Sequence, residues 1–347
     1  MMSSTYVGMD VHQKSTVFCL YNPEAVQDRQ FRTRRVPTTP QAYEEVLKPL
    51  EGNCSVAYEV GPQVQWVAAI VRPLAAEVQV ANAARIPWLF RDGRKNDRLD
   101  ARKLATLLYL NQLPTVHLPP ADISAWRALI NYRRALVKRR TGIKNQVRSI
   151  LRTFGLQCPY RSCWTRRGIA WLRSLTFDHA RNLMAGILLQ DLARLNDQLH
   201  RVEQELDAIA KTHPNVALLR TIPGIGPRTA EAIVAFTDVV RRFPNRKAFG
   251  SYFGMTPTED TSAERVRFGH ISKRGPSVVR WVLVEAVHQA VRHCPALATF
   301  FDRIHRGKKD RYKIAIVATG RKILTICYAM MRYQIPFDPA KVGGSSA

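Results

Sequence analysis

The sequence predicts an α/β domain at the N-terminus, followed by a longer and mostly α-helical region. Up to about residue 120, short apolar runs bounded by turn residues alternate with helical patterns, whereas later apolar residues recur at helical spacing over long stretches. The charge divides at the same place: residues 1–120 carry 14 basic and 11 acidic residues, and residues 121–347 carry 39 and 16. We therefore expect a compact first domain and a second region that binds a polyanion.

Five short segments are predicted as the strands of the first domain, at residues 6–10, 16–20, 31–36, 56–59 and 77–81. Helices are expected over residues 40–50, 62–75 and 99–110. Three consecutive strands followed by alternating strands and helices favour a mixed sheet with helices on its faces, as in the ribonuclease-H-like fold. A sugar-kinase or actin-like ATPase core begins in the same way, but it needs glycine-rich phosphate loops that this sequence does not show.

Four acidic residues of this domain stand in a pattern typical of a metal site. Asp10 and Glu59 each end a strand, and Asp97 and Asp100 lie one helical turn apart where a helix begins. Carboxylates in this arrangement hold paired Mg²⁺, with Mn²⁺ as an alternative, and paired Mg²⁺ is common machinery for cutting phosphodiester bonds. The apolar runs before Asp10 and Glu59 make an uncompensated charge costly there, which favours a bound cation.

Two other interpretations of these acids stay open. Asp97 and Asp100 also fit surface ion pairs with Lys95 and Arg98. His12, two residues after Asp10, is either a group that assists the site or a structural histidine.

A long helix is predicted over residues 124–154, with a basic stripe at spacing four. The stripe consists of Arg140, Lys144, Arg148 and Arg152. Like charges at this spacing repel each other, so a stripe without acidic partners indicates a nucleic-acid backbone lying along it. The alternative is a solvated helix face.

A second long helix carries apolar residues in a strict four-three alternation from Leu188 to Ile209, which predicts about three heptads of coiled coil. The sequence leaves open whether this seam packs on the preceding helix or on a second chain.

Glycines after this helix resemble the turn of a helix-hairpin-helix module. Gly224 and Gly226 would let backbone N–H groups approach a phosphate, and a plain helix–helix turn is the alternative. Residues 254–275 read as a loop rich in Thr, Ser, Arg and Lys, and Lys273 and Arg274 near its end are further candidates for nucleic-acid contact. Apolar helices are expected over residues 277–293 and 313–333.

The bulk composition agrees with an intracellular nucleic-acid-binding protein. The net charge is +26, and six scattered cysteines form no Cys-x-x-Cys pair. We expect no signal peptide and no membrane span, because the best apolar stretch, residues 314–331, is interrupted by Arg321 and Lys322. A reducing cytoplasm follows as the expected location.

Several motifs, taken in order, resemble the IS110 (IS-one-ten) family of transposases, which are bridge-RNA-guided DNA recombinases. The motifs are Gly-Met-Asp-Val-His at 8–12, Tyr-Glu at 58–59, Lys-Asn-Asp-x-x-Asp-Ala at 95–101, Pro-Gly-Ile-Gly-Pro at 223–227, Phe-Gly-Met-Thr-Pro at 253–257 and Gly-His-Ile-Ser-Lys-Arg-Gly at 269–275.

This resemblance implies a division of the chain into four parts. Residues 1–120 would be a RuvC-like nuclease domain in which Asp10, Glu59, Asp97 and Asp100 form the Asp-Glu-Asp-Asp set and bind the metal. Residues 121–213 would hold the basic helix and coiled coil for RNA or DNA binding and subunit contacts. Residues 214–340 would form the C-terminal transposase domain, and residues 341–347 a flexible tail.

The resemblance also implies a nucleophilic serine in the C-terminal domain. The family commonly shows Ser-Ser-Gly where this chain has Thr261, Ser262 and Ala263. Ser262 falls on the second serine and is the predicted nucleophile, with Thr261 as a lesser candidate. Ala263 replaces the usual glycine, which puts the local backbone conformation in doubt.

Further expectations come from the same resemblance. A structured non-coding bridge RNA would pair with donor and target double-stranded DNA, and the protein would act as a homo-oligomer, a dimer or a tetramer in synapsis, associated with the bacterial nucleoid. The metal site of one subunit would meet the serine of another. Two alternatives stay open: a RuvC-like junction resolvase that uses water as the nucleophile, and a non-catalytic nucleic-acid-binding regulator.

Overall fold

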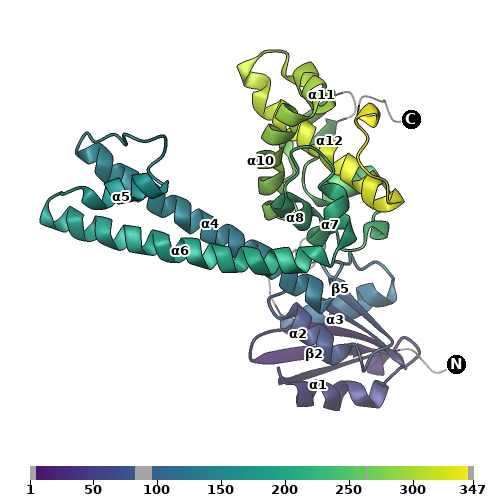
Figure 1. Ribbon diagram of the computed structural model, residues 1–347. Helices are drawn as coiled ribbons and strands as arrows, with labels where there is room; N and C mark the ends of the chain where they lie inside the picture. The colour runs from purple at the N-terminus through teal and green to yellow at the C-terminus, as the bar shows by residue number, and fades with distance from the viewer. Residues whose placement is uncertain (1–4, 83–95, 263–264, 343–347) are drawn as a thin grey trace. The chain divides into compact units, whose positions relative to one another are not determined.

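The structure is a computed structural model that describes residues 5–82, 96–262 and 265–342; for residues 259–262 and 265–268 it describes the backbone alone. The chain divides into two compact units, Met1–Ala121 and Asp122–Ala347. The elements of both units are labelled in Figure 1.

The first unit is built on a five-stranded mixed sheet in the order β3-β2-β1-β4-β5. The strands are β1 Thr5–Val11, β2 Ser15–Tyr21, β3 Phe31–Pro37, β4 Cys54–Glu59 and β5 Glu77–Ala81. Strands β1, β2 and β3 pair antiparallel, whereas β1, β4 and β5 pair parallel. The predicted mixed α/β sheet is confirmed, and each of the five predicted segments lies within a strand.

Helices cover both faces of this sheet. Helices α1 (Pro40–Leu47) and α2 (Val64–Val71) pack against the side of β1 that carries Val7 and Met9. Helix α3 (Asp97–Tyr109) packs against the opposite side. The first two helices are shorter than predicted: a 3₁₀ turn continues α1 over residues 48–50, and α2 ends at Val71 before a turn that contains Pro73.

Gly8 sets how closely α3 approaches the sheet. A Cβ atom at this position would lie 1.9 Å from the carbonyl oxygen of Ala101 and 2.6 Å from the amide nitrogen of Ala105. No side chain fits in that space, so the glycine brings the backbone of α3 against β1. The start of α3 is thereby held beside the residues that follow Gly8.

The second unit begins with two long helices that lie side by side, α4 (Ala121–Thr153) and α6 (His179–Lys211), with the short α5 (Arg166–Ser174) beside their far ends (Figure 1). Leu136 of α4 clusters with Leu195 and Leu199 of α6. Part of the predicted leucine seam therefore packs on the preceding helix of the same chain, while a coiled coil and contact with a second chain stay predictions.

Six further helices form the C-terminal body of this unit. They are α7 Pro214–Leu219, α8 Pro227–Thr237, α9 Arg246–Tyr252, α10 Ser277–His293, α11 Pro295–His305 and α12 Tyr312–Tyr333. Helix α8 lies at the centre, since every residue from Thr229 to Thr237 is buried. Short 3₁₀ turns occur at Gln27–Arg29, Lys48–Leu50, Val240–Arg242, Lys309–Arg311 and Pro339–Lys341.

The base of the two long helices is anchored in this body. Ile123, Trp126 and Leu206 belong to its core cluster. Arg127 of α4 donates hydrogen bonds to the carbonyl oxygens of Ala235, at 2.7 Å, and Phe236, at 3.3 Å, which are among the last groups of α8. These carbonyls have no partner within the helix, so the guanidinium caps its C-terminus.

The predicted loop over residues 254–275 is wrong in part, because it contains a β-hairpin. Strand β6 (Pro257–Ser262) pairs antiparallel with β7 (Arg265–Ile271). Strand β6 is polar, whereas in β7 Val266 and Phe268 alternate with Arg265 and Arg267. That short alternation was outweighed by the Thr, Ser, Arg and Lys content of the segment, which favoured a loop.

Helix α12 belongs to the longest apolar segment of the described chain. By length and hydropathy the segment Lys309–Tyr333 is sufficient to cross a membrane, yet 56% of its most apolar stretch is buried within the protein. A core helix of a folded body passes the same test, and Ala315, Ile323 and Leu324 indeed lie in the core cluster.

Candidate functional site

Asp10 lies on the face of the sheet that α3 covers. Strand residues alternate between faces, so Asp10 shares a side with Gly8, while Val7 and Met9 point to the other core. Across the antiparallel ladder Asp10 is opposite Val17, and Val17 is opposite Arg35. Asp10 and Arg35 therefore present their side chains on the same face, two strands apart.

Helix α3 brings Asp97 and Asp100 to this face. Asn96 caps the helix by accepting a hydrogen bond from the amide of Arg98, so Asp97 is the first helical residue. Asp97 and Asp100 precede the buried stripe of Ala101 and Leu104 at helical spacing. The close packing allowed by Gly8 then places the first turn of α3 beside the end of β1.

The side chains meet in a compact cluster that we call the acid cluster, consisting of Asp10, His12 and Asp97. Their ligand atoms all lie within 4.8 Å of one another. His12 Nε2 is 3.2 Å from Asp10 Oδ2 and 3.7 Å from Asp97 Oδ1. The imidazole therefore lies between the two carboxylates, and a role for His12 in the predicted site stays a prediction.

Arg35 adds a positive charge beside the acid cluster. The sequence pattern did not identify this residue. Its Nη2 donates to Asp97 Oδ2 at 2.5 Å, and its Nη1 donates to Ser15 Oγ at 3.0 Å. The expected ion pairs of Asp97 with Lys95 or Arg98 did not point to this residue. Its pairing with Val17, which is itself opposite Asp10, is the signal that would have found it.

The two acids respond in opposite ways to their surroundings. Burial raises the pKa of Asp10; His12 opposes this shift, and the charges of Asp97 and Asp100 reinforce it. The hydrogen bond from Arg35 lowers the pKa of Asp97. The negative charge of Asp100 therefore reaches Asp10. Of Asp10 and Asp97, only Asp10 has a carboxylate whose ionised form is disfavoured by its surroundings.

Glu59 lies one strand away on the same face. Met9 and Tyr58 are parallel partners, so Glu59 follows beside Asp10 at the end of the neighbouring strand. Ala57 packs toward α3, and strand alternation puts Glu59 on that side as well. Its carboxylate is outside the group of ligand atoms within 4.8 Å.

The donor set of this face fits a divalent cation. Two carboxylates and an imidazole converge, and further acids lie on the neighbouring turn and strand. Mg²⁺ binds through one or two carboxylates and keeps several waters, and Mn²⁺ also accepts imidazole. A cation here would compensate the charge that burial makes costly at Asp10.

The predicted nucleophile lies in the second unit, at the end of β6. The backbone of Ser262 is paired with Arg265, and that of Thr261 with Val266. The side chains of both residues, and the whole of Ala263, lie outside the described part of the chain, so the roles of Ser262 and Thr261 stay predictions.

The glycines of the predicted helix-hairpin-helix turn differ in their surroundings. Gly224 has φ +87°, and a Cβ atom there would lie 2.3 Å from the amide nitrogen of Ala290, so this glycine lets the turn pack against α10. Gly226 is exposed and precedes α8, with no atom within 4 Å of an added Cβ. A contact with phosphate stays a prediction for both.

The basic stripe of α4 is accompanied by an aromatic ring. Lys144 Nζ lies 5.1 Å from the centroid of the Trp164 ring, and the Arg148 guanidinium lies 5.4 Å from it. Burial, together with Arg140 and Arg148, lowers the pKa of Lys144. Within the described residues, Arg140, Lys144, Arg148 and Arg152 form no ion pair.

Lys273 and Arg274 lie on an exposed turn whose backbone is hydrogen-bonded by Arg280. Lys273 has φ +53° and Gly275 has φ +70°. Arg280 Nη1 donates to the carbonyl oxygens of Arg274, at 2.6 Å, and Gly275, at 3.2 Å. The turn therefore presents two cations to solvent on a fixed backbone.

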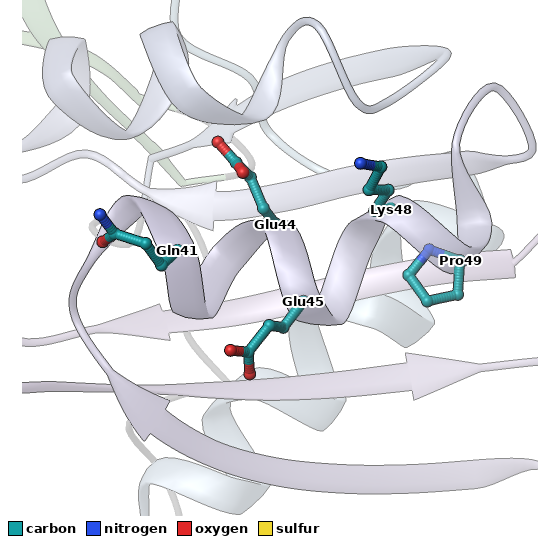
Figure 2. A pocket seen from close by; sticks show the side chains of 5 residues that line it. All are labelled: Gln41, Glu44, Glu45, Lys48 and Pro49. Atoms are coloured by element: carbon teal, nitrogen blue, oxygen red, sulfur yellow. The ribbon is translucent and has the colours of Figure 1, made fainter.

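A surface hollow on the other face of the first unit contributes nothing to these sites. It is lined by Gln41, Glu44, Glu45, Lys48 and Pro49, which belong to α1 and the turn after it (Figure 2). Glu44 and Glu45 are exposed and lie on the side of the sheet opposite to Asp10. They serve below as ordinary surface acids for comparison.

Two family models match separate parts of the chain. A model described as Transposase, for the DEDD transposases of IS110 elements, matches residues 7–155. A model described as Transposase IS116/IS110/IS902 family matches residues 216–302. The first match contains all four predicted acids, and the second contains Ser262.

Curated proteins with similar sequences carry related names. A probable family 20 transposase of Pseudomonas aeruginosa is 26% identical over 298 residues, which is 82% of this chain and 86% of that protein. The transposase for insertion sequence element IS1111A of Coxiella burnetii is 24% identical over 75% of this chain and 71% of its own. A pilin gene-inverting protein of Moraxella lacunata is 29% identical over 48% of this chain and 50% of its own.

Proposed function

The chain belongs to the IS116/IS110/IS902 family of transposases, and from this premise we propose that it cuts and rejoins DNA as the recombinase of an insertion sequence. The observation that carries the proposal is the acid cluster, in which Asp10, His12 and Asp97 bring their ligand atoms within 4.8 Å of one another. A strand order of β3-β2-β1-β4-β5 supports a RuvC-like assignment for the first unit.

We assign metal binding to Asp10, Glu59, Asp97 and Asp100. Bound Mg²⁺ or Mn²⁺ would supply polarisation of the scissile phosphate and stabilisation of the leaving 3′ oxygen. The protein contributes orientation: His12 holds Asp10 at 3.2 Å, and Arg35 holds Asp97 at 2.5 Å, so both carboxylates are fixed before DNA arrives.

The proposed nucleophile is Ser262. Its hydroxyl oxygen would form a bond to the DNA phosphorus while the bond from phosphorus to the 3′ oxygen breaks; the serine loses its proton, and the released 3′ oxygen gains one. The phosphoserine linkage keeps the bond energy of the phosphodiester. A 3′ hydroxyl of another strand can then attack it, which reseals the DNA and regenerates the serine without ATP.

We propose that sequence choice is delegated to a structured RNA that pairs with donor and target DNA. The protein then needs to grip backbones and shapes rather than base sequences. Supporting this, residues 121–347 carry 39 basic and 16 acidic residues, and the stripe on α4 has no acidic partner among the described residues. A homo-oligomer working in the cytoplasm, at the nucleoid, completes the proposal.

The test uses the full-length protein with Mg²⁺, DNA that carries the ends of its element, and RNA transcribed from that element. We expect cleavage to leave a protein–DNA adduct on a denaturing gel, with the phosphate on Ser262 by mass spectrometry. Ser262→Ala should lose the adduct and the cleavage, whereas Thr261→Ala should keep both. If Ser262→Ala still cuts DNA while Asp10→Ala does not, the enzyme is a water-using resolvase instead.

Subunit sharing and RNA guidance have separate readouts. Mixing Asp10→Ala with Ser262→Ala should restore cleavage if the acids and the serine act from different chains. A defined RNA that co-purifies with the protein, and whose loops match the ends of the element, is the expected result for guidance. Cleavage of the same DNA without RNA would overturn the guidance alone.

A further inference from the structure

A second place in the C-terminal body gathers cations around one aromatic ring. The Arg303 guanidinium lies 5.1 Å from the centroid of the Phe300 ring, and Lys322 Nζ lies 5.8 Å from the same centroid. Phe300 and Arg303 belong to α11, and Lys322 belongs to α12. Two helices therefore bring positive charge to one half-buried ring.

A third cation comes from α9. Burial lowers the pKa of Lys322, and the charges of Arg246, the first residue of α9, and of Arg303 lower it further. Helix α9 also contacts α12 closely at Gly250, where an added Cβ would lie 3.9 Å from Cγ of Arg321. We call Arg246, Arg303 and Lys322, together with Phe300, the cation cradle.

The elements that carry the cradle are held by the core. Phe249 of α9, Phe301 of α11, and Ile323 and Leu324 of α12 are all buried in one cluster. Each cationic residue lies within three positions of a buried side chain of its own helix. The packing of the three helices consequently brings the charges together. Their mutual repulsion lowers the stability of the folded state.

No acid relieves that cost in the described part of the chain. None of the three cations forms an ion pair there, although other cations of the same unit do: Arg201 with Asp197 at 3.0 Å, and Lys341 with Asp338 at 3.7 Å. Cation–π contacts with the ring offset part of the repulsion but leave the net charge of three. Such a group is matched by a polyanion with closely spaced charges.

We propose that the cation cradle binds the sugar–phosphate backbone of a nucleic acid, as a contact separate from the stripe on α4. The proposal rests on the proposed function, because it names a place where DNA or RNA is held by the transposase. Phosphates accept charge-assisted hydrogen bonds from guanidinium and ammonium groups, and such contacts position the nucleic acid without reading its sequence. Duplex DNA and structured RNA share this chemistry, so the experiment separates them.

The experiment compares two triple variants of the full-length chain that lose the same charge. One replaces the cradle cations, Arg246→Gln with Arg303→Gln and Lys322→Gln. The control replaces ion-paired and exposed cations of the same unit, Arg181→Gln with Arg201→Gln and Lys341→Gln. Dissociation constants for a random duplex and for the RNA of the element are measured by fluorescence anisotropy at several salt concentrations.

If the cradle contacts three phosphates of duplex DNA, its loss should reduce the slope of log K against log salt by about 2.7, or by about 2 for single-stranded RNA. We expect the affinity of the cradle variant for the duplex, the RNA or both to fall at least about tenfold further than that of the control. The ligand whose affinity falls is the nucleic acid that the cradle binds. The charge-preserving variant, Arg246→Lys with Arg303→Lys and Lys322→Arg, should bind within about twofold of the wild type.

Different failures have different meanings. If the cradle variant matches the control in affinity and slope while the wild-type chain binds and cleaves DNA, the cradle is wrong and the proposed function stands. If the wild-type chain binds neither ligand, both fall. If the glutamine variant does not fold, the charge-preserving variant provides the test. It keeps all three positive charges, so weakened nucleic-acid binding by this variant would overturn the cradle.

Discussion

The first unit brings acids together beside a histidine and an arginine, whereas the stripe on α4 and the cation cradle of the second unit form no ion pair within the described residues. In the acid cluster, His12 lies 3.2 Å from Asp10 and Arg35 lies 2.5 Å from Asp97. On α4, the cations Lys144 and Arg148 have the ring of Trp164 beside them instead of a carboxylate. The difference indicates two kinds of ligand: a small cation for carboxylates that converge, and a long polyanion for a row of cations.

The size of the site follows from the same comparison. Carboxylates that converge within 4.8 Å suit an ion. Cations spaced four residues apart along α4 match the repeat of a phosphate backbone rather than a single anion. The carboxylates of the first unit therefore converge on one position, whereas the cations of α4 are spread along the helix.

The largest expected effect breaks the acid cluster. Asp10→Asn should lower Mg²⁺-dependent strand cleavage by about 10³-fold or more, since an acid that binds the metal is lost. Cleavage of plasmid DNA measures it, and Glu44→Gln, an exposed acid of α1, is the matched control with unchanged activity expected. Full cleavage by Asp10→Asn would remove the metal from the proposal.

The same variant should make the metal-free protein more stable. Burial raises the folded-state pKa of Asp10 above its usual value of 3.8, so the native fold loses stability as pH rises from that value through the raised pKa. At neutral pH the ionised carboxylate is a cost, and the amide removes it. A higher melting temperature in EDTA is expected for Asp10→Asn, and a lower one for Asp97→Asn, whose ionised form Arg35 stabilises.

The next effect tests how the acids are brought together. Gly8→Ala should destabilise the first unit by about 3 kcal/mol, because the new methyl group meets the backbone of α3. Gly61→Ala, where an added Cβ has no atom within 4 Å, should change stability by less than about 1 kcal/mol. Urea unfolding measures both, and equal midpoints would show that α3 does not lie against Gly8.

A smaller effect tests the line of cations. Lys144→Gln with Arg148→Gln should weaken nucleic-acid binding about tenfold and reduce the salt slope by about 1.8. Arg194→Gln with Arg201→Gln, which remove cations already paired with Asp191 and Asp197, should change the slope much less. Identical slopes for the two pairs would mean that the stripe on α4 is an ordinary solvated face.

The smallest effect concerns the buried acid of the second unit. Glu231 in α8 is 1% exposed and lies 3.3 Å from Arg228, and burial raises its pKa from 4.5 to about 7. The fold therefore loses stability as pH rises from about 4.5 to about 7. Glu231→Gln should flatten that part of the profile, as unfolding midpoints at pH 5 and pH 8 would show. A wild-type profile that rises over the same interval would contradict the assignment.

Much of the first unit was predictable because apolar runs and turns identify its elements. Strands such as β1 follow from apolar runs such as Tyr6–Asp10. A helix was expected from Leu99, two residues after the observed start of α3 at Asp97, which Asn96 caps. Arg35 was not predicted, because a cation on the polar strand β3 looks like a solvated residue until strand register places it near Asp97.

In the second unit, long helices were predictable and short elements were not. The heptads of α6 and the stripe of α4 are visible in the sequence because they repeat. In the β6–β7 hairpin only β7 alternates apolar with polar residues, and that alternation is short. Helix α11 follows α10 after the single residue Cys294, so the boundary between them does not stand out. The cation cradle was missed because its charges come from three helices that only the tertiary fold brings together.

Arg127 joins the last carbonyls of α8 to the base of α4, and this has a mechanical consequence. A force applied at the far end of the two long helices would be carried into the most buried helix of the body instead of being absorbed by a hinge. The long helices and the body should then melt in a single calorimetric peak. Within one protomer, a force on the long helices would then be transmitted to the C-terminal body that carries Ser262.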